Sequence, residues 1–162
     1  MSHVKNKVEW CLKKALKEVG EGGKHRGLVK VEPSMENARE HIGKSEHYLE
    51  ASLKLEKEFS DISASTLFYS AYHSLLAILA KFGYESGNQE CTFAFIYSLI
   101  EDRKIDLSKD LVNSIVLDRE SVVGLRERFQ YGVELSMKNE LFNGCVDVVK
   151  KILGGAKDVV EK

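Results

Sequence analysis

The sequence predicts an all-α protein, an up-and-down bundle of about five helices with an extra helix at the N-terminus. Apolar residues recur three and four positions apart along most of the chain, which is the period of a helix with one buried face. The run from Ser63 to Tyr84 is apolar nearly all round, with Lys81 as its one fully charged residue. Such a run is typical of a helix packed on several sides. Short connections favour antiparallel neighbours.

Length and charge set the broad class. A chain of 162 residues with a net charge of −1 predicts one globular domain without an overall nucleic-acid or membrane footprint. Residues 1–30 nevertheless hold eight lysines and arginines against three glutamates. We therefore expect residues 1–33 to form an N-terminal helix and a basic, glycine-containing loop, and residues 34–162 to form the helical bundle, all in one compact domain.

The first helix spans Val4 to Val19 and is amphipathic, and the glycines that follow end it. The loop after it lacks the spacing of a phosphate-binding loop, because Glu18 stands where a Walker loop needs its first glycine. The loop carries a basic patch of Lys24, His25, Arg26 and Lys30. This patch is either a solvated surface or a set of phosphate contacts. Residues 28–31 favour a short extended segment.

Two long helices follow. Ser34 is an N-cap for a helix that runs to about Phe59. His41 and His47 lie six residues apart on this helix, about 240° around its axis, so they cannot chelate one metal ion and are interpreted as surface histidines. The central helix begins at Ser60 or Asp61 and ends at Gly83, before a loop over residues 85–88.

The C-terminal half predicts three more helices. They cover Thr92 to Arg103, a segment that begins at Ser108, and a segment from Asn139 onward. In the middle one, Arg119, Val122, Arg126 and Phe129 follow at spacings of three and four, which predicts that both arginines share one helix face. The arginines either snorkel or pair with Glu120 and Glu127, or they form a guanidinium pair at a groove or dimer seam that binds phosphate or RNA.

Metal and disulfide chemistry are not expected. Cys11, Cys91 and Cys145 are odd in number and show no CxxC spacing, so we expect reduced thiols and a cytoplasmic protein. The five histidines show no ligand spacing, which predicts neither a metal site nor a cofactor. Polar and charged residues along the central run, such as His73 and Lys81, argue against a membrane span.

His73 is the most informative single residue. It lies in the middle of the apolar run, one turn after Tyr69 and directly after Tyr72. It is either a core histidine that hydrogen-bonds to a neighbour, or part of a polar pocket between helices that binds a ligand or acts as an acid or base.

Two segments resemble a known family. The stretch ISASTLFYSAYHSLLAILAKFGYESGNQECTFAFIYSLIE, residues 62–101, is similar to the central part of the HEPN (higher eukaryotes and prokaryotes nucleotide-binding) domain, with its alanine-rich helix and Tyr-x-x-Tyr/Phe-His core. The stretch LRERFQYG, residues 125–132, resembles the later HEPN segment that carries an arginine element. With the flanking helices, the resemblance covers about residues 35–160, and it is to the stand-alone prokaryotic and archaeal members.

The resemblance implies a helical bundle that often forms a homodimer. Many HEPN proteins are toxins paired with a minimal nucleotidyltransferase antitoxin, and active members are metal-independent ribonucleases that use an arginine followed by a histidine. Arg126 matches that arginine, but Tyr131 stands where the histidine belongs, and no histidine follows His73. A tyrosine is a poor general base near neutral pH because its ordinary pKa is about 10.

Three functions remain open. The first is a binding module for a nucleotide, RNA or a nucleotidyltransferase partner, with Arg126, Tyr131, His73, Arg119, Tyr69 and Tyr72 at its site. The second is a ribonuclease toxin that uses Arg126 with His73 or Tyr131. The third is a structural, homo-oligomeric helical adaptor. The missing histidine favours the binding module over the enzyme.

Overall fold

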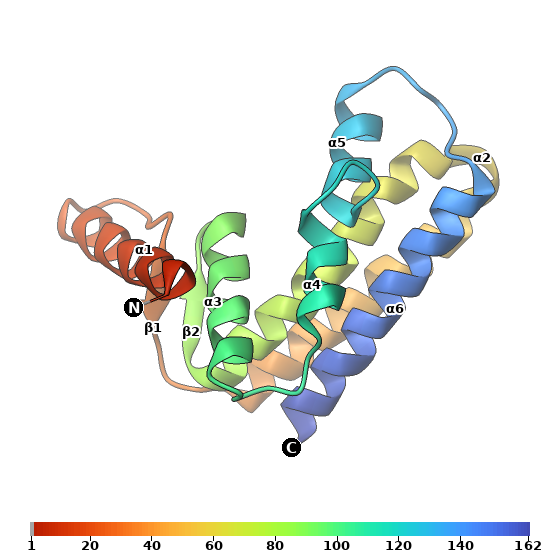
Figure 1. Cartoon of the computed structure of the whole chain (residues 1–162). Helices are drawn as coiled ribbons and strands as arrows, with labels where there is room; N and C mark the ends of the chain where they lie inside the picture. Colours follow the sequence, from red (N-terminus) through yellow and green to blue (C-terminus); the bar gives the residue numbers. More distant parts are fainter. Residues whose placement is uncertain (1) are drawn as a thin grey trace.

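The computed structural model describes residues 2–162, and within them it is all-α apart from one small sheet (Figure 1). The elements in chain order are α1 (His3–Gly20), β1 (Leu28–Lys30), α2 (Met35–Phe82), β2 (Tyr84–Ser86), α3 (Gln89–Glu101), α4 (Lys109–Val116), α5 (Val122–Tyr131) and α6 (Asn139–Glu161). The predicted fold class, an all-α bundle, is therefore confirmed.

Element α2 is a helical hairpin. The backbone of Phe59 leaves the helical region (φ −137°, ψ 46°), and the chain reverses there, so residues 35–58 form a first arm and residues 60–82 a second arm. The amide of Ser34, which precedes the first arm, donates to the carbonyl of Ala80 near the end of the second. The two long helices expected from the sequence are thus present and antiparallel. Ser60 was a candidate N-cap of the second arm. Its hydroxyl accepts a hydrogen bond from the Met137 amide at 2.7 Å.

Serines line the contact between the two arms. Ser45 Oγ donates to the carbonyl of Ser70 at 2.7 Å and lies 2.8 Å from Ser74 Oγ, while Ser70 Oγ donates to the carbonyl of Ser45 at 2.8 Å. All three serines are fully buried. Small side chains allow the helix axes to come close together. The hydroxyls hydrogen-bond to one another and to backbone carbonyls, as buried polar groups must where water is excluded.

The second arm is covered on its remaining sides by α6, α5 and α3. Helix α6 runs alongside the hairpin (Figure 1). Its buried residues repeat at helical spacing: Phe142, Cys145, Val149, Ile152, Ala156 and Val160. An 18-residue window of α2 has the length and composition of a membrane span, but most of that window is buried inside the protein. This burial is what the central helix of a bundle shows.

The segment after Ser108 is two helices, and the expectation of a continuous one is wrong. Helix α4 ends at Val116, residues 117–121 form a turn, and Ser121 caps α5 by accepting a hydrogen bond from the Gly124 amide. Asp118 stabilises the turn because its side chain accepts from the Glu120 amide at 2.9 Å. The three-and-four spacing of apolar residues therefore continues across residues 117–121, although the helix is interrupted there. As a consequence, Arg119 lies in the turn and does not share a helix face with Arg126.

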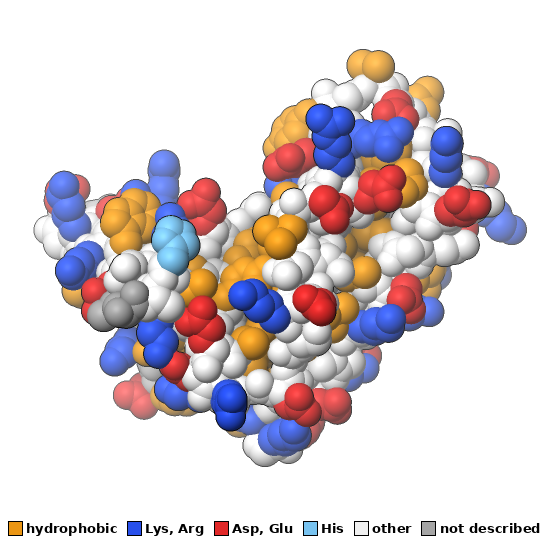
Figure 2. Space-filling view, in the orientation of Figure 1, with side chains coloured by type: hydrophobic (Ala, Val, Ile, Leu, Met, Phe, Trp, Pro, Cys, Tyr) orange, Lys and Arg blue, Asp and Glu red, His pale blue; other side chains and the backbone are white. Residues whose placement is uncertain are grey.

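The N-terminal lobe, residues 2–33, packs on the bundle through α3 and the sheet. Helix α1 lies against α3, and β1 pairs antiparallel with β2, with Val29 opposite Glu85. The short extended segment at residues 28–31 was expected, but β2 was not, since residues 85–88 were expected to be a loop. Figure 2 shows a hollow between this lobe and the end of the molecule formed by α5, with hydrophobic side chains along its floor.

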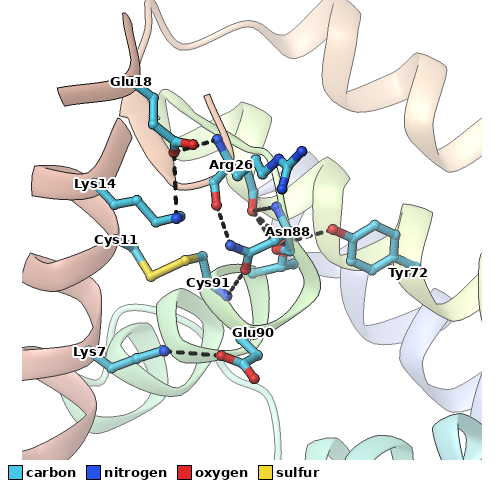
Figure 3. Close-up of a disulfide and its surroundings, with 11 residues drawn as sticks. Lys7, Cys11, Lys14, Glu18, Arg26, Tyr72, Asn88, Glu90 and Cys91 are labelled. Atoms are coloured by element: carbon cyan, nitrogen blue, oxygen red, sulfur yellow. Dashed lines mark hydrogen bonds and ion pairs between the residues drawn. A yellow bond between two sulfur atoms is a disulfide. The ribbon is translucent and has the colours of Figure 1, made fainter. Parts of the chain in front are cut away.

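A disulfide joins Cys11 of α1 to Cys91 of α3 (Figure 3). The S–S distance is 2.07 Å and both residues are fully buried. The expectation of three reduced thiols is therefore wrong for this pair, which is separated by 80 residues and gives no spacing signal in the sequence. Gly27 packs against the backbone of α1 next to this disulfide. A Cβ atom on Gly27 would fall 2.2 Å from the carbonyl oxygen of Cys11. Only glycine allows the loop to approach α1 this closely.

Candidate functional site: the aromatic face of the hairpin

The most concentrated set of rings and cations in the described chain lies on one side of the hairpin, between the first arm and α5. We refer to it as the aromatic face. It consists of His41, Lys44 and Tyr48 from the first arm, Phe68, Tyr69, Tyr72 and His73 from the second arm, and Arg126 from α5.

The second arm supplies the centre of the aromatic face. Residues four apart on a helix lie one above the other, so Phe68 is followed by Tyr72 and Tyr69 by His73. The rings of Phe68 and Tyr72 stack, with centroids 5.6 Å apart and planes 15° apart. Tyr69 meets Phe68 edge to face at 5.3 Å. Phe68 is fully buried, whereas Tyr69 is 37% exposed and presents its ring to solvent.

The first arm adds a second layer of rings. Tyr48 stacks on His73 with centroids 5.6 Å apart and lies 5.4 Å from the Tyr69 ring. The ammonium group of Lys44 lies 5.2 Å from the centroid of Tyr48. Aromatic pairs at these separations contribute about 0.5–1.5 kcal/mol beyond their buried area. The rings of Tyr48, Tyr69 and His73 therefore form a continuous, partly exposed surface, and the Lys44 ammonium group lies at its edge.

His73 also faces a second histidine. Its Nδ1 atom lies 3.0 Å from Nδ1 of His41 on the opposite arm, within hydrogen-bonding distance. Burial lowers the pKa of His73 to about 4, with smaller contributions from His41 and Lys44. Burial lowers the pKa of His41 as well, partly offset by Glu40. Both imidazoles are thus neutral at neutral pH, and one must donate its N–H to the other.

Arg126 borders the aromatic face from α5. Its guanidinium carbon lies 4.2 Å from the centroid of Phe68, a cation–π contact. Within residues 2–162 its buried Nε atom has no hydrogen-bond partner and its guanidinium forms no ion pair with a carboxylate. The neighbouring Arg128 differs, because it pairs with Glu134 at 2.8 Å. Arg126 is therefore held by packing, and its charge is not neutralised by the protein.

Hydrogen bonds connect the aromatic face to the basic loop. The Tyr72 hydroxyl lies 3.0 Å from Thr92 Oγ1, which donates to the carbonyl of Asn88 at the start of α3. The Asn88 side chain in turn donates to the carbonyl of Arg26. Figure 3 shows Tyr72 pointing toward Asn88, with Arg26 next to it. Arg26 is exposed, and its backbone carbonyl links the basic loop to the start of α3.

The other residues singled out in the sequence lie elsewhere. Tyr131 is 72% exposed and lies five residues after Arg126, about 140° around the helix. Arg119 lines a cavity of about 570 Å³ between the α4–α5 turn and α6, together with Asp118, Glu120 and Glu140. Three carboxylates beside one guanidinium make that cavity unsuitable for an anion.

The residues of the predicted basic patch do not act as one surface. Lys24 and Lys30 are exposed, whereas His25 is half-buried with its Nε2 atom 3.5 Å from a Glu85 carboxylate oxygen. Of the predicted site, the aromatic face unites Arg126, His73, Tyr69 and Tyr72, and Arg26 is connected to it only through its backbone carbonyl. Tyr131, Arg119, Lys24, His25 and Lys30 are not part of it.

Four residues of the aromatic face were missed in the sequence: His41, Lys44, Tyr48 and Phe68. His41 was interpreted as a surface histidine but is half-buried against His73, whereas His47 is indeed exposed. The register of the hairpin, which only the structure gives, accounts for this pair. Residues that face each other have numbers that sum to about 115, as Ser34 with Ala80 and Ser45 with Ser70 do, and the same rule pairs His41 with His73.

Comparisons of the chain with models of protein families and with curated proteins gave no match. The likeness to HEPN proteins therefore rests on the motifs of residues 62–101 and 125–132.

Proposed function

We propose that the protein is a HEPN-like module that binds single-stranded RNA or a nucleotide on the aromatic face without cleaving it. One observation carries the proposal: the exposed ring of Tyr69 contacts the Tyr48 ring on one side and, on the other, the Phe68 ring that the unpaired guanidinium of Arg126 covers. A stacking surface flanked by cations is how proteins bind single-stranded nucleic acids.

The two parts of such a ligand would meet different groups. A base stacks on Tyr69 or Tyr48, which contributes about 1–3 kcal/mol per base in known complexes. A phosphate meets Arg126 or Lys44, and a guanidinium already held by Phe68 loses little freedom when it binds.

The geometry favours binding over catalysis. His73 has a pKa of about 4 and shares its Nδ1 contact with His41, so it is a weak general base at neutral pH. Phe68 and Tyr69 stand between His73 and Arg126, and Tyr131 points away from Arg126. A ribonuclease that combines Arg126 with either residue is therefore the less favoured function.

Binding is tested by fluorescence anisotropy with a labelled single-stranded RNA and with ATP. We expect Arg126→Ala and Tyr69→Ala each to weaken binding by about tenfold, which is the loss of one ion contact or one stacked base. Arg128→Ala is the matched control, because Arg128 lies on the same helix but is neutralised by Glu134. Equal affinity of all variants, or no binding by the wild type, would refute the proposal. Electrophoresis of the same RNA after incubation shows whether it stays intact.

We further propose that the protein forms a homodimer and that a minimal nucleotidyltransferase is its partner, as in many HEPN systems. Exposed apolar residues at the end of the molecule near the hairpin reversal support a self-association surface: Phe59, Ile62, Tyr131, Val133 and Leu135. Light scattering checks this, with a dimer expected for the wild type and a monomer for Val133→Glu combined with Leu135→Glu.

A further inference from the structure

We propose that the hairpin of α2 straightens at Phe59 and exchanges its first arm with a second copy of this chain, which gives a domain-swapped homodimer. The proposal rests on the homodimer proposed above and names how its two copies are joined, and it does not depend on nucleic-acid binding by the aromatic face. The carrying observation is that the contact faces of the two arms share one helical register across the reversal.

The contact between the arms follows a seven-residue repeat. Ser45 Oγ of the first arm donates to the Ser70 carbonyl, and Ser63 Oγ of the second arm donates to the Ser52 carbonyl at 3.0 Å. A hairpin alone requires no common register, because each arm could turn any of its faces toward the other. In a continuous helix, however, the contact residues and Phe59 would form one stripe, the pattern that packs two long helices side by side. Their spacings are seven, or four and three: Ser45, Ser52, Phe59, Ser63, Thr66 and Ser70.

The reversal lacks the residues that normally produce one. Residues 44–82 contain no glycine, proline or asparagine, and Phe59 is the one residue within α2 whose dihedral angles are non-helical. Helices commonly end at glycine or asparagine, because these residues tolerate the backbone of the turn. The Phe59 side chain is also 49% exposed, and nearby Leu53 and Ile62 are 43% and 48% exposed. The local sequence therefore favours a continuous helix, and the closed hairpin leaves three apolar side chains in water.

Exchange at Phe59 preserves the contacts of the closed protein. Residues 2–58 meet the rest of the chain through the serine contacts, the β1–β2 pairing, the disulfide and ion pairs such as Arg39–Glu161. In the exchanged dimer, each of these forms between copies. Two straightened helices of 48 residues, each about 72 Å long, lie antiparallel. The exposed apolar side chains at the two reversals then meet near the midpoint, which favours the dimer.

The disulfide shows which form is present. Once Cys11 and Cys91 are joined within one chain, residues 2–58 cannot leave that chain, so exchange takes place in the reduced protein. On oxidation, Cys11 bonds to Cys91 of the other copy in an exchanged dimer and to Cys91 of its own chain in a closed monomer. Each bond formed transfers two electrons and two protons to the oxidant, as when oxidised glutathione becomes two molecules of reduced glutathione.

A mixture of two cysteine variants tests the exchange. Cys11→Ala and Cys91→Ala are reduced, mixed, equilibrated in mild urea, returned to buffer with oxidised glutathione and run on an SDS gel without reductant. Neither variant forms this disulfide within its own chain, whereas an exchanged pair forms one between copies. We expect the mixture to give a band at twice the mass of one chain, which dithiothreitol removes. Each variant treated alone should stay monomeric on the gel, and these samples control for disulfides of Cys145.

The length of the reversal supplies a second test with both cysteines in place. Insertion of Gly-Ser-Gly between Phe59 and Ser60 relaxes the turn. After oxidation of the reduced protein, it should lower the covalent dimer of the wild type at least about tenfold, because two glycines in a continuous helix are unfavourable. The same insertion after Gly22, in the exposed loop between α1 and β1, should leave the dimer unchanged.

The exchange is overturned if the cysteine mixture gives no covalent dimer, or if the insertion after Phe59 leaves the dimer band unchanged. Light scattering of the same samples separates this result from a failure of the proposed homodimer. A dimer in solution without the covalent link would keep the homodimer and exclude the exchange, whereas a monomer would overturn both.

Discussion

The hairpin and the N-terminal lobe are attached to the molecule in different ways. The second arm of the hairpin is apolar on most sides and is covered by the first arm, α6, α5 and α3. The lobe buries only a narrow stripe of α1, around Cys11 and Ala15, and leaves Trp10, Leu16 and Val19 exposed. One disulfide, a sheet of three residue pairs and exposed ion pairs such as Lys5–Asp102 and Lys7–Glu90 add to its attachment.

This difference shows where the stability of the fold is concentrated. Burial of apolar area, which dominates folding free energy, is concentrated in the hairpin and α6. The lobe depends more on a single covalent link, whose effect comes from limiting the unfolded chain. The aromatic face lies on the hairpin, so its ring positions are set by the most strongly packed part of the protein.

The largest expected effect is in the hairpin. Phe68→Ala removes a fully buried ring that supports Tyr72 and Arg126, so we expect a loss of about 3–5 kcal/mol in unfolding free energy. Urea denaturation measures it. Tyr69→Ala is the control, because the neighbouring ring is 37% exposed and should cost much less. Similar losses for both variants would contradict the packing described.

The next effect distinguishes the lobe from the hairpin. Reduction of the Cys11–Cys91 disulfide, which closes a loop of about 80 residues, should lower the free energy of opening the lobe by about 2–4 kcal/mol. Hydrogen exchange should then accelerate in α1 and leave the second arm of α2 protected. The double variant Cys11→Ala, Cys91→Ala should not respond to dithiothreitol. Uniform acceleration across both regions would show that they unfold together.

A smaller effect tests the serine contact within the hairpin. Ser45→Ala removes a hydroxyl that hydrogen-bonds to the Ser70 carbonyl and contacts Ser74, at a cost of about 1–2 kcal/mol. Ser45→Val should be worse, because the added methyl groups must fit between closely packed arms. Thermal unfolding compares both with Ser114→Ala on α4, whose hydroxyl bonds only to a carbonyl of its own helix and whose loss should have little effect. A neutral Ser45→Val would mean that the arms are not tightly packed.

The smallest effect concerns pH. The pKa of His73 is about 4 when folded, against 6.5 for an ordinary histidine, so the unfolded chain takes up a proton that the folded protein does not. The stability contribution of neutral His73 is complete above about pH 6.5 and is lost as the pH falls toward 4. Because the ring is half-exposed, we expect about 1 kcal/mol.

The difference between the wild type and His73→Gln isolates that contribution. Surface carboxylates such as Glu161 and Glu134 titrate in both proteins and cancel in the comparison. Urea unfolding at pH 7.5 and pH 4.5 should therefore show a smaller loss of stability for His73→Gln. Parallel losses in the two proteins would indicate that His73 is not shielded from water.

The sequence by itself determined the helices and which of them is central. The period of apolar residues is a local property, and it identified α1, both arms of α2, α3 and α6, with N-caps at Ser34 and Ser108. The same period missed the break at residues 117–121, because a turn capped by Ser121 interrupts the backbone without interrupting the pattern. The candidates Tyr69, Tyr72, His73 and Arg126 came instead from the place of His73 among tyrosines and from the resemblance to HEPN proteins.

Only the tertiary structure decided which of these residues meet. Cys11 with Cys91 and His41 with His73 are pairs between different helical segments, and their spacing along the chain carries no trace of the contact. The register of the two arms, set by closely packed serines, brings His41 to His73. The packing of α5 on the second arm brings Arg126 to Phe68. Side-chain contacts depend on distances in space, and these are fixed when the helices pack rather than when they form.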